Sequence, residues 1–429
     1  MGHASTESPI GAATKTPATV TAAAIEGAAA RIAGVVDVTP LQLNVRLSAA
    51  TGADVWVKRE DLQPVRSYKL RGAYNLIAQL DEHDRARGVV CASAGNHGQG
   101  VAFACSRLGI QGRIFVPSTT PRQKRDRMTE IGGPFVELVV TGDTYDDAAA
   151  AAKRAAAESD SVLVPAFDDP ATIAGQGTIA PEIVAALGRA PDLLVVPVGG
   201  GGLLAGLVSW FAERHPATRI VGVEPRGAAC VVAALAVGRP VELAKVDSFV
   251  DGAAVRRAGD VTFPIIQASG VEVITVAEGA VCSEMLAMYQ TDGIIAEPAG
   301  ALASAAVPTL ARRGQTVVAI VSGGNNDVSR YNEIVERSLV YEGRKHYFLV
   351  SFPQEPGALR RFLDEVLGPD DDITLFEYVK RNNRELGPAL VGIELGDPRE
   401  LPALLARMEA APMGVEVIDP DGPFYRFLI

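Results

Sequence analysis

The sequence predicts an α/β protein with two lobes, each built on a doubly wound sheet, and a smaller C-terminal α+β domain. Short β-branched apolar runs alternate with helical stretches from about residue 53 to about residue 340, as in parallel sheets covered on both faces. This stretch is longer than one compact sheet requires. We therefore expect a small lobe at about 60–165 and a larger lobe made of the remainder of 25–340.

The elements of the small lobe follow from apolar periodicity and from helix stop signals. A strand at 54–60 (DVWVKRE) is expected to lead into this lobe. Its own strands are expected at 88–93 (GVVCAS), 113–117 (RIFVP), 135–140 (FVELVV) and 161–166 (SVLVPA). Helices are expected at 68–80 (YKLRGAYNLIAQL), 97–109 (HGQGVAFACSRLG), 121–132 (PRQKRDRMTEIG) and the Ala-rich 145–159.

The larger lobe is expected to contain, in this order, a buried strand at 192–198 (DLLVVPV), a glycine loop, a helix at 203–214 and a strand at 219–225. After Arg344 the order becomes strand, helix, strand, strand, helix, strand. This order indicates a ferredoxin-like domain over 341–429. It contains no grouping of nucleophile and base, which favours a regulatory or binding role for this domain.

Composition and charge exclude several classes of protein. Apolar residues make up 48% of the chain and charged residues 21%, as in globular proteins. The net charge of −11 argues against a nucleic-acid partner, and no apolar run approaches the ~20 residues that span a membrane. The four cysteines are far apart, without zinc spacing, which suits a reducing cytoplasm. The segment 1–24 is Ala-, Thr-, Ser- and Pro-rich at its start and is expected to be a mobile tail.

Four consecutive glycines mark the clearest candidate site. The strand at 192–198 is joined to the helix that starts at Leu203 by Gly199, Gly200, Gly201 and Gly202. Backbone N–H groups and a helix N-terminus then point at one spot, which suits a phosphate. One alternative is a tight turn alone, although four glycines exceed what a turn needs. Another is a dinucleotide fingerprint, since Gly200, Gly202 and Ala205 are followed by Glu224.

Two further loops follow strands and hold small polar residues. The stretch 91–100 (CASAGNHGQG) contains Ser93, Asn96 and His97, and 319–327 (AIVSGGNND) contains Ser322. Taken alone, the first is equally well explained as a helix start capped by Ser93 or Asn96, and the second as a turn. Together with the glycine loop they favour a ligand site, because ligands of open α/β sheets bind at strand C-terminal ends.

These loops, together with SYKLRGA around Lys69, resemble the motifs of fold-type II pyridoxal-phosphate (PLP) enzymes, the tryptophan synthase β-like class. Four motifs occur in the order and spacing of the biosynthetic threonine dehydratase (threonine ammonia-lyase) family, which this chain resembles: SYKLRGA, SAGNHGQG, VPVGGGGLLAG and VSGGNND. The resemblance covers roughly residues 25–340, and the C-terminal part is similar to that family's ACT-like regulatory domain. It implies a PLP-dependent catalytic domain followed by a regulatory one.

The resemblance also assigns roles to residues. It implies that Lys69 binds PLP covalently and is the catalytic base, and that the backbone N–H groups of Gly199–Gly202 and Leu203 hold the cofactor phosphate. It places Asn96 at the ring 3′-oxygen, Ser322 at the pyridine nitrogen and Glu297 close to the ring. Around the substrate carboxylate it places Ser93, Asn96 and His97.

The lysine lies between Arg66 and Arg71. A lysine must lose its proton to attack an aldehyde, so its pKa has to fall from about 10.4. Neighbouring cations would push it that way. The direction of the two arginine side chains does not follow from the sequence: they either tune the lysine or face water.

Other positions separate branches of the superfamily. Serine racemases resemble SSGNH at the second loop, whereas this chain has Ala94, which cannot transfer a proton. Dehydration is therefore favoured over racemisation. Glu224 and Ala228 match two positions of a cation site in the racemase branch, but Cys230 stands where an aspartate would be. The sequence thus predicts no divalent metal and leaves a monovalent cation open.

The resemblance implies conversion of L-threonine to 2-oxobutyrate and ammonia, the first step of isoleucine biosynthesis, with feedback by isoleucine and a homotetrameric assembly in the cytoplasm. Within the superfamily, the alternative is a serine dehydratase or another PLP-dependent β-eliminating enzyme. Outside it, the alternatives are an NAD-dependent dehydrogenase, which leaves the other loops unexplained, and a catalytically dead amino-acid-binding regulator.

Overall fold

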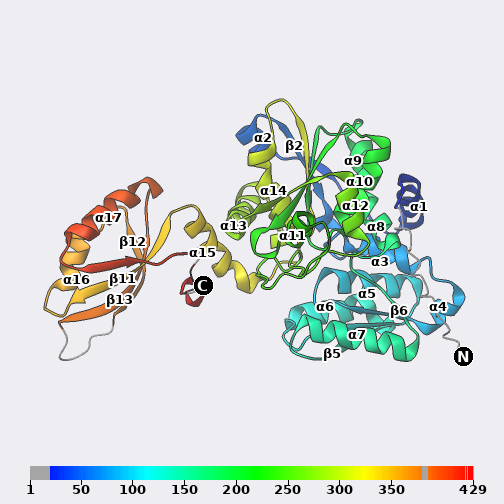
Figure 1. Ribbon diagram of the computed structural model, residues 1–429, viewed down its shortest axis with the longest axis horizontal. Helices are drawn as coiled ribbons and strands as arrows, with labels where there is room; N and C mark the ends of the chain where they lie inside the picture. Colours follow the sequence, from blue (N-terminus) through cyan, green and yellow to red (C-terminus); the bar gives the residue numbers. More distant parts are fainter. Residues whose placement is uncertain (1–19, 379–384, 421, 423, 429) are drawn as a thin grey trace, which may run out of the picture.

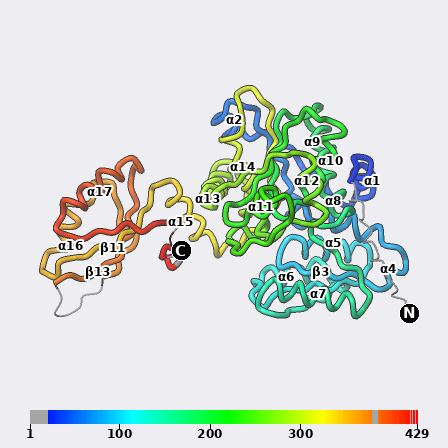
Figure 2. The backbone as a smooth tube through the Cα atoms, viewed as in Figure 1, coloured from blue at the N-terminus to red at the C-terminus, as the bar shows by residue number. Residues whose placement is uncertain are grey.

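The structure is a computed structural model that describes residues 20–378, 385–420, 422 and 424–428. Two lobes lie against each other, and a C-terminal unit lies to one side of them (Figure 1). The tube in Figure 2 shows that helix α15 (Tyr331–Tyr341) is the segment of the chain that leads from the lobes into the C-terminal unit.

The larger lobe is built on a six-stranded sheet with the order β1-β2-β10-β7-β8-β9. Its strands are β1 (Leu41–Leu43), β2 (Asp54–Arg59), β7 (Leu193–Pro197), β8 (Arg219–Pro225), β9 (Glu272–Val276) and β10 (Thr316–Val321). Only β1 runs antiparallel to its neighbour. Strand β10 pairs with β2 on one side, where Val317 lies opposite Val55, and with β7 on the other, where it lies opposite Leu193.

Both faces of this sheet are buried under helices, since alternate residues of a strand point to opposite faces. Leu194 and Val196 of β7 join one apolar core, and Leu193 and Val195 join the other. The first core is completed by α1 (Ala22–Ile32), α8 (Pro170–Gly177), α9 (Ile179–Leu187), α10 (Gly202–Arg214), α11 (Cys230–Val237) and α12 (Thr262–Ser269). The second is completed by α2 (Val45–Thr51), α13 (Glu278–Ala287), α14 (Pro298–Leu310) and α15.

The small lobe is built on a four-stranded parallel sheet with the order β5-β4-β3-β6. Its strands are β3 (Val89–Ala92), β4 (Gly112–Val116), β5 (Val136–Val140) and β6 (Val162–Leu163). One face packs on α3 (Lys69–Ile77), α5 (Asn96–Leu108) and α6 (Arg122–Gly132), and the other on α7 (Tyr145–Ser159). Helix α4 (Glu82–Arg87) precedes β3. Helix α7 has the predicted bounds because Thr144 and Asp147 form a capping box at its start.

The C-terminal unit has the predicted ferredoxin-like order of strands and helices. Its elements are β11 (Lys345–Pro353), α16 (Ala358–Arg361), the π-helical turn η6 (Phe362–Val366), β12 (Asp372–Tyr378), β13 (Leu386–Glu394), α17 (Leu401–Ala410) and β14 (Gly414–Val417). The strands form an antiparallel sheet, β12-β13-β11-β14. The helices bury one face of it around Phe348, Phe352 and Phe362. Residues 379–384, between β12 and β13, lie outside the described residues.

Short helical turns complete the chain: η1 (Glu60–Leu62), η2 (Gly133–Phe135), η3 (Arg226–Ala228), η4 (Met288–Asp292), η5 (Val328–Arg330), η7 (Pro398–Glu400) and η8 (Tyr425–Phe427). The α/β fold with an additional C-terminal α+β unit is the predicted one. In the described part of the chain, no helix is both long and apolar enough to cross a membrane.

The prediction of a tail reaching residue 24 is wrong for residues 22–24. Helix α1 starts at Ala22, because the Thr21 side chain accepts a hydrogen bond from the Ala24 N–H and caps it. Ala22 and Ile25 are then buried in the first core of the larger lobe. The rest of the predicted tail, residues 1–19, lies outside the described residues.

Candidate active site

Lys69 is the first residue of α3, and the start of this helix is attached to the third polar loop. The Tyr68 N–H donates to the Ser322 carbonyl at 3.1 Å, and Ser67 forms a β-bridge with Gly323. The Lys69 ammonium nitrogen lies 5.0 Å from the centroid of the Tyr68 ring. Among the described residues, this nitrogen has no hydrogen-bond or ion-pair partner. No hydrogen-bond acceptor or carboxylate of the described residues therefore competes with a ligand for this nitrogen.

The glycine loop forms a cradle of unblocked backbone N–H groups at the start of α10. Gly201 precedes the helix with φ +94°, and no side chain caps it. A Cβ added at Gly200 would lie 2.3 Å from the Phe167 ring, and one at Gly202 would lie 2.5 Å from Gln176 Oε1. A tight turn explains the glycine at 201. The close approaches at 200 and 202 are additional constraints that a turn alone does not impose.

The second loop begins α5 without a side-chain cap, so the explanation as a capped helix start is wrong. The N-cap is Gly95, and neither Ser93 nor Asn96 occupies that position. Asn96 instead donates to Glu297 Oε1 at 2.5 Å and accepts a hydrogen bond from Asn325 at 2.7 Å. The amides of the first turn of α5 remain available to an anion.

Glu297 lies at the point where the second and third loops meet. It directly precedes α14, its N–H donates to the Gly323 carbonyl at 3.1 Å, and its side chain is 4% exposed. Burial, with a contribution from the charge of Asp251, raises the pKa of Glu297 to about 7 despite the hydrogen bond from Asn96. Close to neutral pH this carboxyl group exchanges a proton easily.

His97 is buried, and its ring is hydrogen-bonded to the backbone that follows β6. Its Nε2 lies 2.8 Å from the Val164 carbonyl, while Nδ1 has no partner among the described residues. Burial lowers the pKa of His97 to about 4, so the ring is neutral. Because a carbonyl only accepts hydrogen bonds, Nε2 carries the proton, and Nδ1 has none to donate to a carboxylate. The backbone N–H of His97, in the first turn of α5, is the group that suits the predicted role.

The other predicted polar residues lie in or beside the same loops. The Ser322 hydroxyl is buried and donates to the Ala299 carbonyl at 3.0 Å. Ser93 accepts a hydrogen bond from the Gly95 N–H at 3.2 Å. Backbone and side-chain contacts thus connect the start of α3 at Lys69 with Ser322, Glu297 and Asn96. The glycine cradle approaches Glu297 through the neighbouring segment Gly252–Ala253.

Sequence reasoning missed three residues beside this network. Asn325 binds Asn96, and it lies within the VSGGNND motif, so the signal was present. Lys124 of α6 and Asp251 of the larger lobe form an ion pair at 2.6 Å that joins the two lobes. No local pattern marks that pair. A cavity of about 640 Å³ opens beside the site and is lined from both lobes by residues that include Arg66, Gln99, Lys124, Asn325 and Asn326.

Glu224 is fully buried and is bonded to the start of α11. Its two carboxylate oxygens accept hydrogen bonds from the Val231 and Val232 N–H groups, each at 2.8 Å. Burial raises its pKa to about 7. A carboxylate held in this way does not reach a ribose, which removes the dinucleotide interpretation. Ala228 is buried in the turn before α11.

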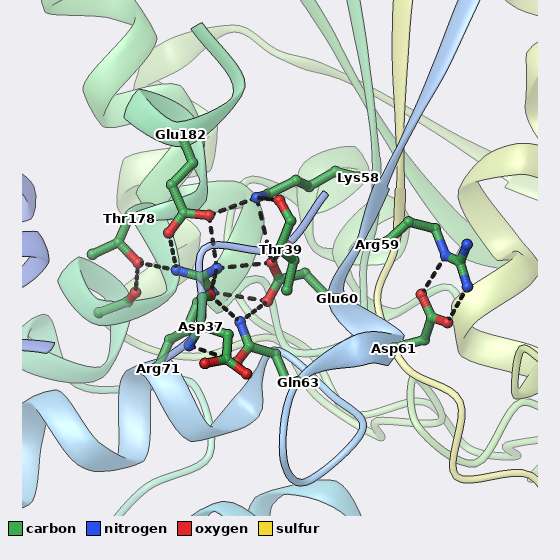
Figure 3. Close-up of polar contacts among 11 residues, drawn as sticks. Asp37, Thr39, Lys58, Arg59, Glu60, Asp61, Gln63, Arg71, Thr178 and Glu182 are labelled. Atoms are coloured by element: carbon green, nitrogen blue, oxygen red, sulfur yellow. Dashed lines mark hydrogen bonds and ion pairs between the residues drawn. The ribbon is translucent and has the colours of Figure 1, made fainter. Parts of the chain in front are cut away.

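The two arginines beside Lys69 have different surroundings, and neither pairs with the lysine. Arg66 is exposed, with φ +56°, and its guanidinium reaches the Ile295 carbonyl at 3.5 Å. Arg71 is fully buried among charged groups on the far side of α3, where it binds Glu60 and Glu182 (Figure 3). The expectation that it faces water is wrong for Arg71, which is buried and paired with two carboxylates.

The residues present fit PLP on structural grounds. The cofactor requires a free amine, a phosphate cradle and polar partners for its ring. Lys69 supplies an amine without a protein partner, and the Gly199–Gly202 loop supplies uncapped amides in a space that a Cβ would fill. Asn96 and Ser322 are polar groups that follow the C-terminal ends of β3 and β10.

Comparisons with known proteins agree with this reading of the fold and loops. A family model described as "Pyridoxal-phosphate dependent enzyme" matches residues 32–323, and one described as "C-terminal regulatory domain of Threonine dehydratase" matches residues 336–428. Among solved structures, the processed threonine deaminase isoform 2 of Solanum lycopersicum aligns with a TM-score of 0.70 at 37% identity, covering 75% of this chain and 96% of that one. Maize serine racemase aligns with a TM-score of 0.69 at 29% identity, covering 76% and 99%.

The fold and the loops therefore define a fold-type II PLP-dependent enzyme. The biosynthetic L-threonine dehydratase of Mycobacterium tuberculosis is 62% identical over 408 residues, which are 94% of this chain and 95% of the relative. That of Corynebacterium glutamicum is 55% identical over 415 residues, 95% of each chain. This chain belongs to the biosynthetic L-threonine dehydratase family.

Proposed function

We propose that this enzyme converts L-threonine to 2-oxobutyrate and ammonia, as the first step of isoleucine biosynthesis. The observation that carries the proposal is the unpartnered Lys69 amine at the start of α3, a helix start that is bonded through the Tyr68 backbone to Ser322. The helices that follow the glycine loop and the second loop also start without side-chain caps. The names of its family relatives supply the substrate.

The site residues divide the work of holding the cofactor. Lys69 would bind PLP covalently, and the amides of Gly199–Gly202 and Leu203 would hold its phosphate. Asn96 would bind the ring 3′-oxygen, Ser322 would bind the pyridine nitrogen, and Glu297 would lie near the ring. When bound, the cofactor supplies an electron sink for negative charge at the substrate Cα.

The remaining steps belong to groups of this chain. The first-turn amides of α5 at Asn96 and His97, with the Ser93 hydroxyl, bind and orient the threonine carboxylate. Lys69 Nζ takes the proton from Cα. That proton and the departing β-hydroxide together make one water. The resulting enamine then takes up one water molecule and releases 2-oxobutyrate and ammonia. Ser322, unlike a carboxylate, does not hold the ring nitrogen protonated, which favours rapid elimination over transamination. Ala94 offers no second proton donor for racemisation.

The division of labour along the chain is part of the proposal. Residues 25–340 form the catalytic domain, and residues 341–429 form a regulatory domain that binds isoleucine as a feedback inhibitor. The C-terminal unit holds a cavity of about 410 Å³ lined mainly by apolar groups, among them Phe352, Ala358, Leu363 and Phe376. A branched aliphatic side chain suits such a lining. We further propose a homotetramer in the cytoplasm, and at Glu224 and Ala228 a weak monovalent cation site at most.

The catalytic proposal is tested by spectroscopy and product assay. The purified protein with PLP is expected to absorb in the visible range, and L-threonine is expected to change that spectrum while 2-oxobutyrate accumulates. Lys69→Ala is expected to lose both the absorbance of the bound cofactor and product formation. An active Lys69→Ala enzyme would overturn the assignment.

Regulation has a separate test. Isoleucine is expected to lower the rate and to raise the melting temperature of the wild-type enzyme, because a ligand that binds the folded state stabilises it. Leu363→Asp, in the C-terminal cavity, is expected to remove both effects while leaving the uninhibited rate unchanged. If isoleucine alters neither quantity in the wild type, the effector proposal is wrong.

A further inference from the structure

Arg71 stands at the centre of a buried cluster of four charges. Its guanidinium makes a two-pronged contact with Glu60, with both bonds at 2.8 Å, and another with Glu182, at 2.6 and 2.9 Å (Figure 3). The Thr178 hydroxyl and the Asp37 carbonyl accept its further hydrogen bonds. All of its N–H groups therefore have acceptors.

Lys58 completes the cluster and balances its charge. Its ammonium donates to Glu182 at 2.5 Å and to the Thr39 carbonyl at 2.7 Å, and it lies 3.9 Å from Glu60. Two cations thus face two anions. Burial opposes the charge of Glu60, but Arg71 and Lys58 outweigh this and hold the pKa of Glu60 below its ordinary value.

The cluster and Lys69 occupy different sides of the same helix turn. Residues two apart on a helix lie about 200° apart around its axis, so Arg71 points away from Lys69. The acceptors of Arg71 come from three other parts of the fold: the end of β2 with η1, the helix pair α8–α9, and the segment before β1. The guanidinium therefore fixes the far side of α3 relative to the larger lobe.

Backbone packing around α3 brings the neighbouring helices close to it on both sides of Lys69 and Arg71. Gly100 of α5 lies against the Lys69 and Leu70 backbone, where an added Cβ would come within about 3.1–3.2 Å of it. Gly175 of α8 lies against the Arg71 carbonyl, with an added Cβ at 2.5 Å. Asn75, one turn further along α3, donates to the Ala171 carbonyl at 2.7 Å and accepts from Arg31 at 2.6 Å. Next to Lys69, the two two-pronged ion pairs of Arg71 are the side-chain contacts with the strictest directional requirements.

We propose that Arg71, through Glu60 and Glu182, is a positioning residue that sets the rotation of α3 and so aims Lys69 at the cofactor and the substrate Cα. Buried ion pairs seldom add net stability over apolar residues of similar volume, whereas they can specify one arrangement. The inference rests on the proposed role of Lys69.

The experiment separates an effect on the stability of the fold from an effect on the position of Lys69. Arg71→Met leaves two carboxylates facing Lys58 alone, so its melting temperature is expected to fall. The double variant Arg71→Met with Glu182→Leu keeps the charge balanced, with Lys58 facing Glu60, and is expected to recover most of the melting temperature. Arg71→Lys keeps the positive charge but cannot make the two-pronged contacts of a guanidinium group with the two carboxylates. Each protein is incubated with PLP and reduced with borohydride, and the fraction of Lys69 that carries the cofactor is followed by mass spectrometry, alongside kcat and KM for L-threonine.

We expect the double variant and Arg71→Lys to attach PLP to Lys69 more slowly than the wild type. Their kcat is expected to fall by on the order of 10²-fold, as for displacement of a reacting group by about 1 Å, with a smaller change in KM. Arg46→Met is the matched control. Arg46 also binds two carboxylates, Glu284 and Asp292, but contacts no residue of the proposed site, so its loss is expected to lower the melting temperature and leave kcat and trapping unchanged.

The outcomes that overturn the proposal are distinct. If the double variant and Arg71→Lys trap PLP and turn over threonine like the wild type, the cluster serves stability alone. The same conclusion follows if Arg46→Met lowers kcat as much as Arg71→Met. If the wild type itself traps no PLP at Lys69, the proposed function fails before the positioning role is reached.

Discussion

The two sides of helix α3 differ in how well their polar groups are satisfied. On one side, Lys69 has no hydrogen-bond or ion-pair partner among the described residues, and the helices that follow the two glycine-containing loops of the site, α5 and α10, start without side-chain caps. On the other side, Arg71 and Glu60 are fully buried and every charge has an opposite charge within reach. Unpaired polar groups mark the place of a ligand, and saturated charges mark the scaffold that holds it.

The largest expected effect on stability lies on the saturated side. Glu60→Ala removes one of the two carboxylates that bind Arg71 and the acceptor of the Thr39 hydroxyl. Breaking a buried ion pair by removing one partner costs about 3–5 kcal/mol of unfolding free energy. Urea denaturation measures this loss. A loss below about 1 kcal/mol, the level of a surface pair, would erase the difference between the two sides of α3.

A smaller effect is expected on the unsaturated side, at the glycine cradle. Gly200→Ala places a methyl group against Phe167 and distorts the loop, and inserting a methyl group in tight packing costs about 1–3 kcal/mol. Because the distorted amides would hold the phosphate, this becomes a loss of PLP affinity of about tenfold or more. Titration of the apoenzyme with PLP measures it. Gly27→Ala in α1, where an added methyl group meets open space, is the control and should leave the affinity unchanged.

A pH-dependent difference is expected from Glu297. Its pKa is raised in the folded state from 4.5 to about 7, so the fold favours its protonated form. The stabilisation is complete below 4.5 and is lost as the pH rises to about 7. Relative to Glu297→Gln, which cannot ionise, the wild type should therefore lose stability between pH 5 and pH 8. Denaturation of both proteins at these two pH values measures the change. An equal difference at both values would contradict the raised pKa.

The smallest effect is expected where a similar arginine fork lies in solvent. Arg399 binds both oxygens of Asp397, which lowers the pKa of Asp397 to about 2, but the Arg399 side chain is 88% exposed. Water and salt replace such contacts with little cost. Arg399→Ala should leave the melting temperature unchanged within error. A fall in melting temperature as large as that of Arg71→Met would show that the two-pronged geometry of the contact, and not its burial, gives the cluster around Arg71 its strength.

Local signals were enough for most of the fold and for the loops of the site. These signals act within a few residues of one another along the chain. The four glycines predict the glycine cradle, the capping box predicts the start of α7, and Gly109 predicts the end of α5. Thr21 carries the same kind of signal and was overlooked, which is why α1 begins earlier than expected.

Contacts between distant residues could not be predicted from one sequence. Glu182 is 111 residues from Arg71, Asp251 is 127 residues from Lys124, and Glu297 is 201 residues from Asn96. Nothing near Arg71 shows which side of the helix will meet carboxylates. The tautomer of His97 likewise depends on the Val164 carbonyl, which only the folded chain brings to it.

The place of β10 has a consequence for how the chain folds. This strand is the last of its sheet to be synthesised, yet it lies between β2 and β7. Its partners in β2, from Asp54 on, are made more than half a chain earlier, and its partners in β7, from Leu193 on, more than a hundred residues earlier. Until residue 321 has emerged, β2 and β7 present open edges that cannot pair with each other. Because such non-local pairing closes large loops, folding of the catalytic lobes is expected to be slow and to complete late. Nascent chains that end before Thr316 are therefore the forms most exposed to aggregation.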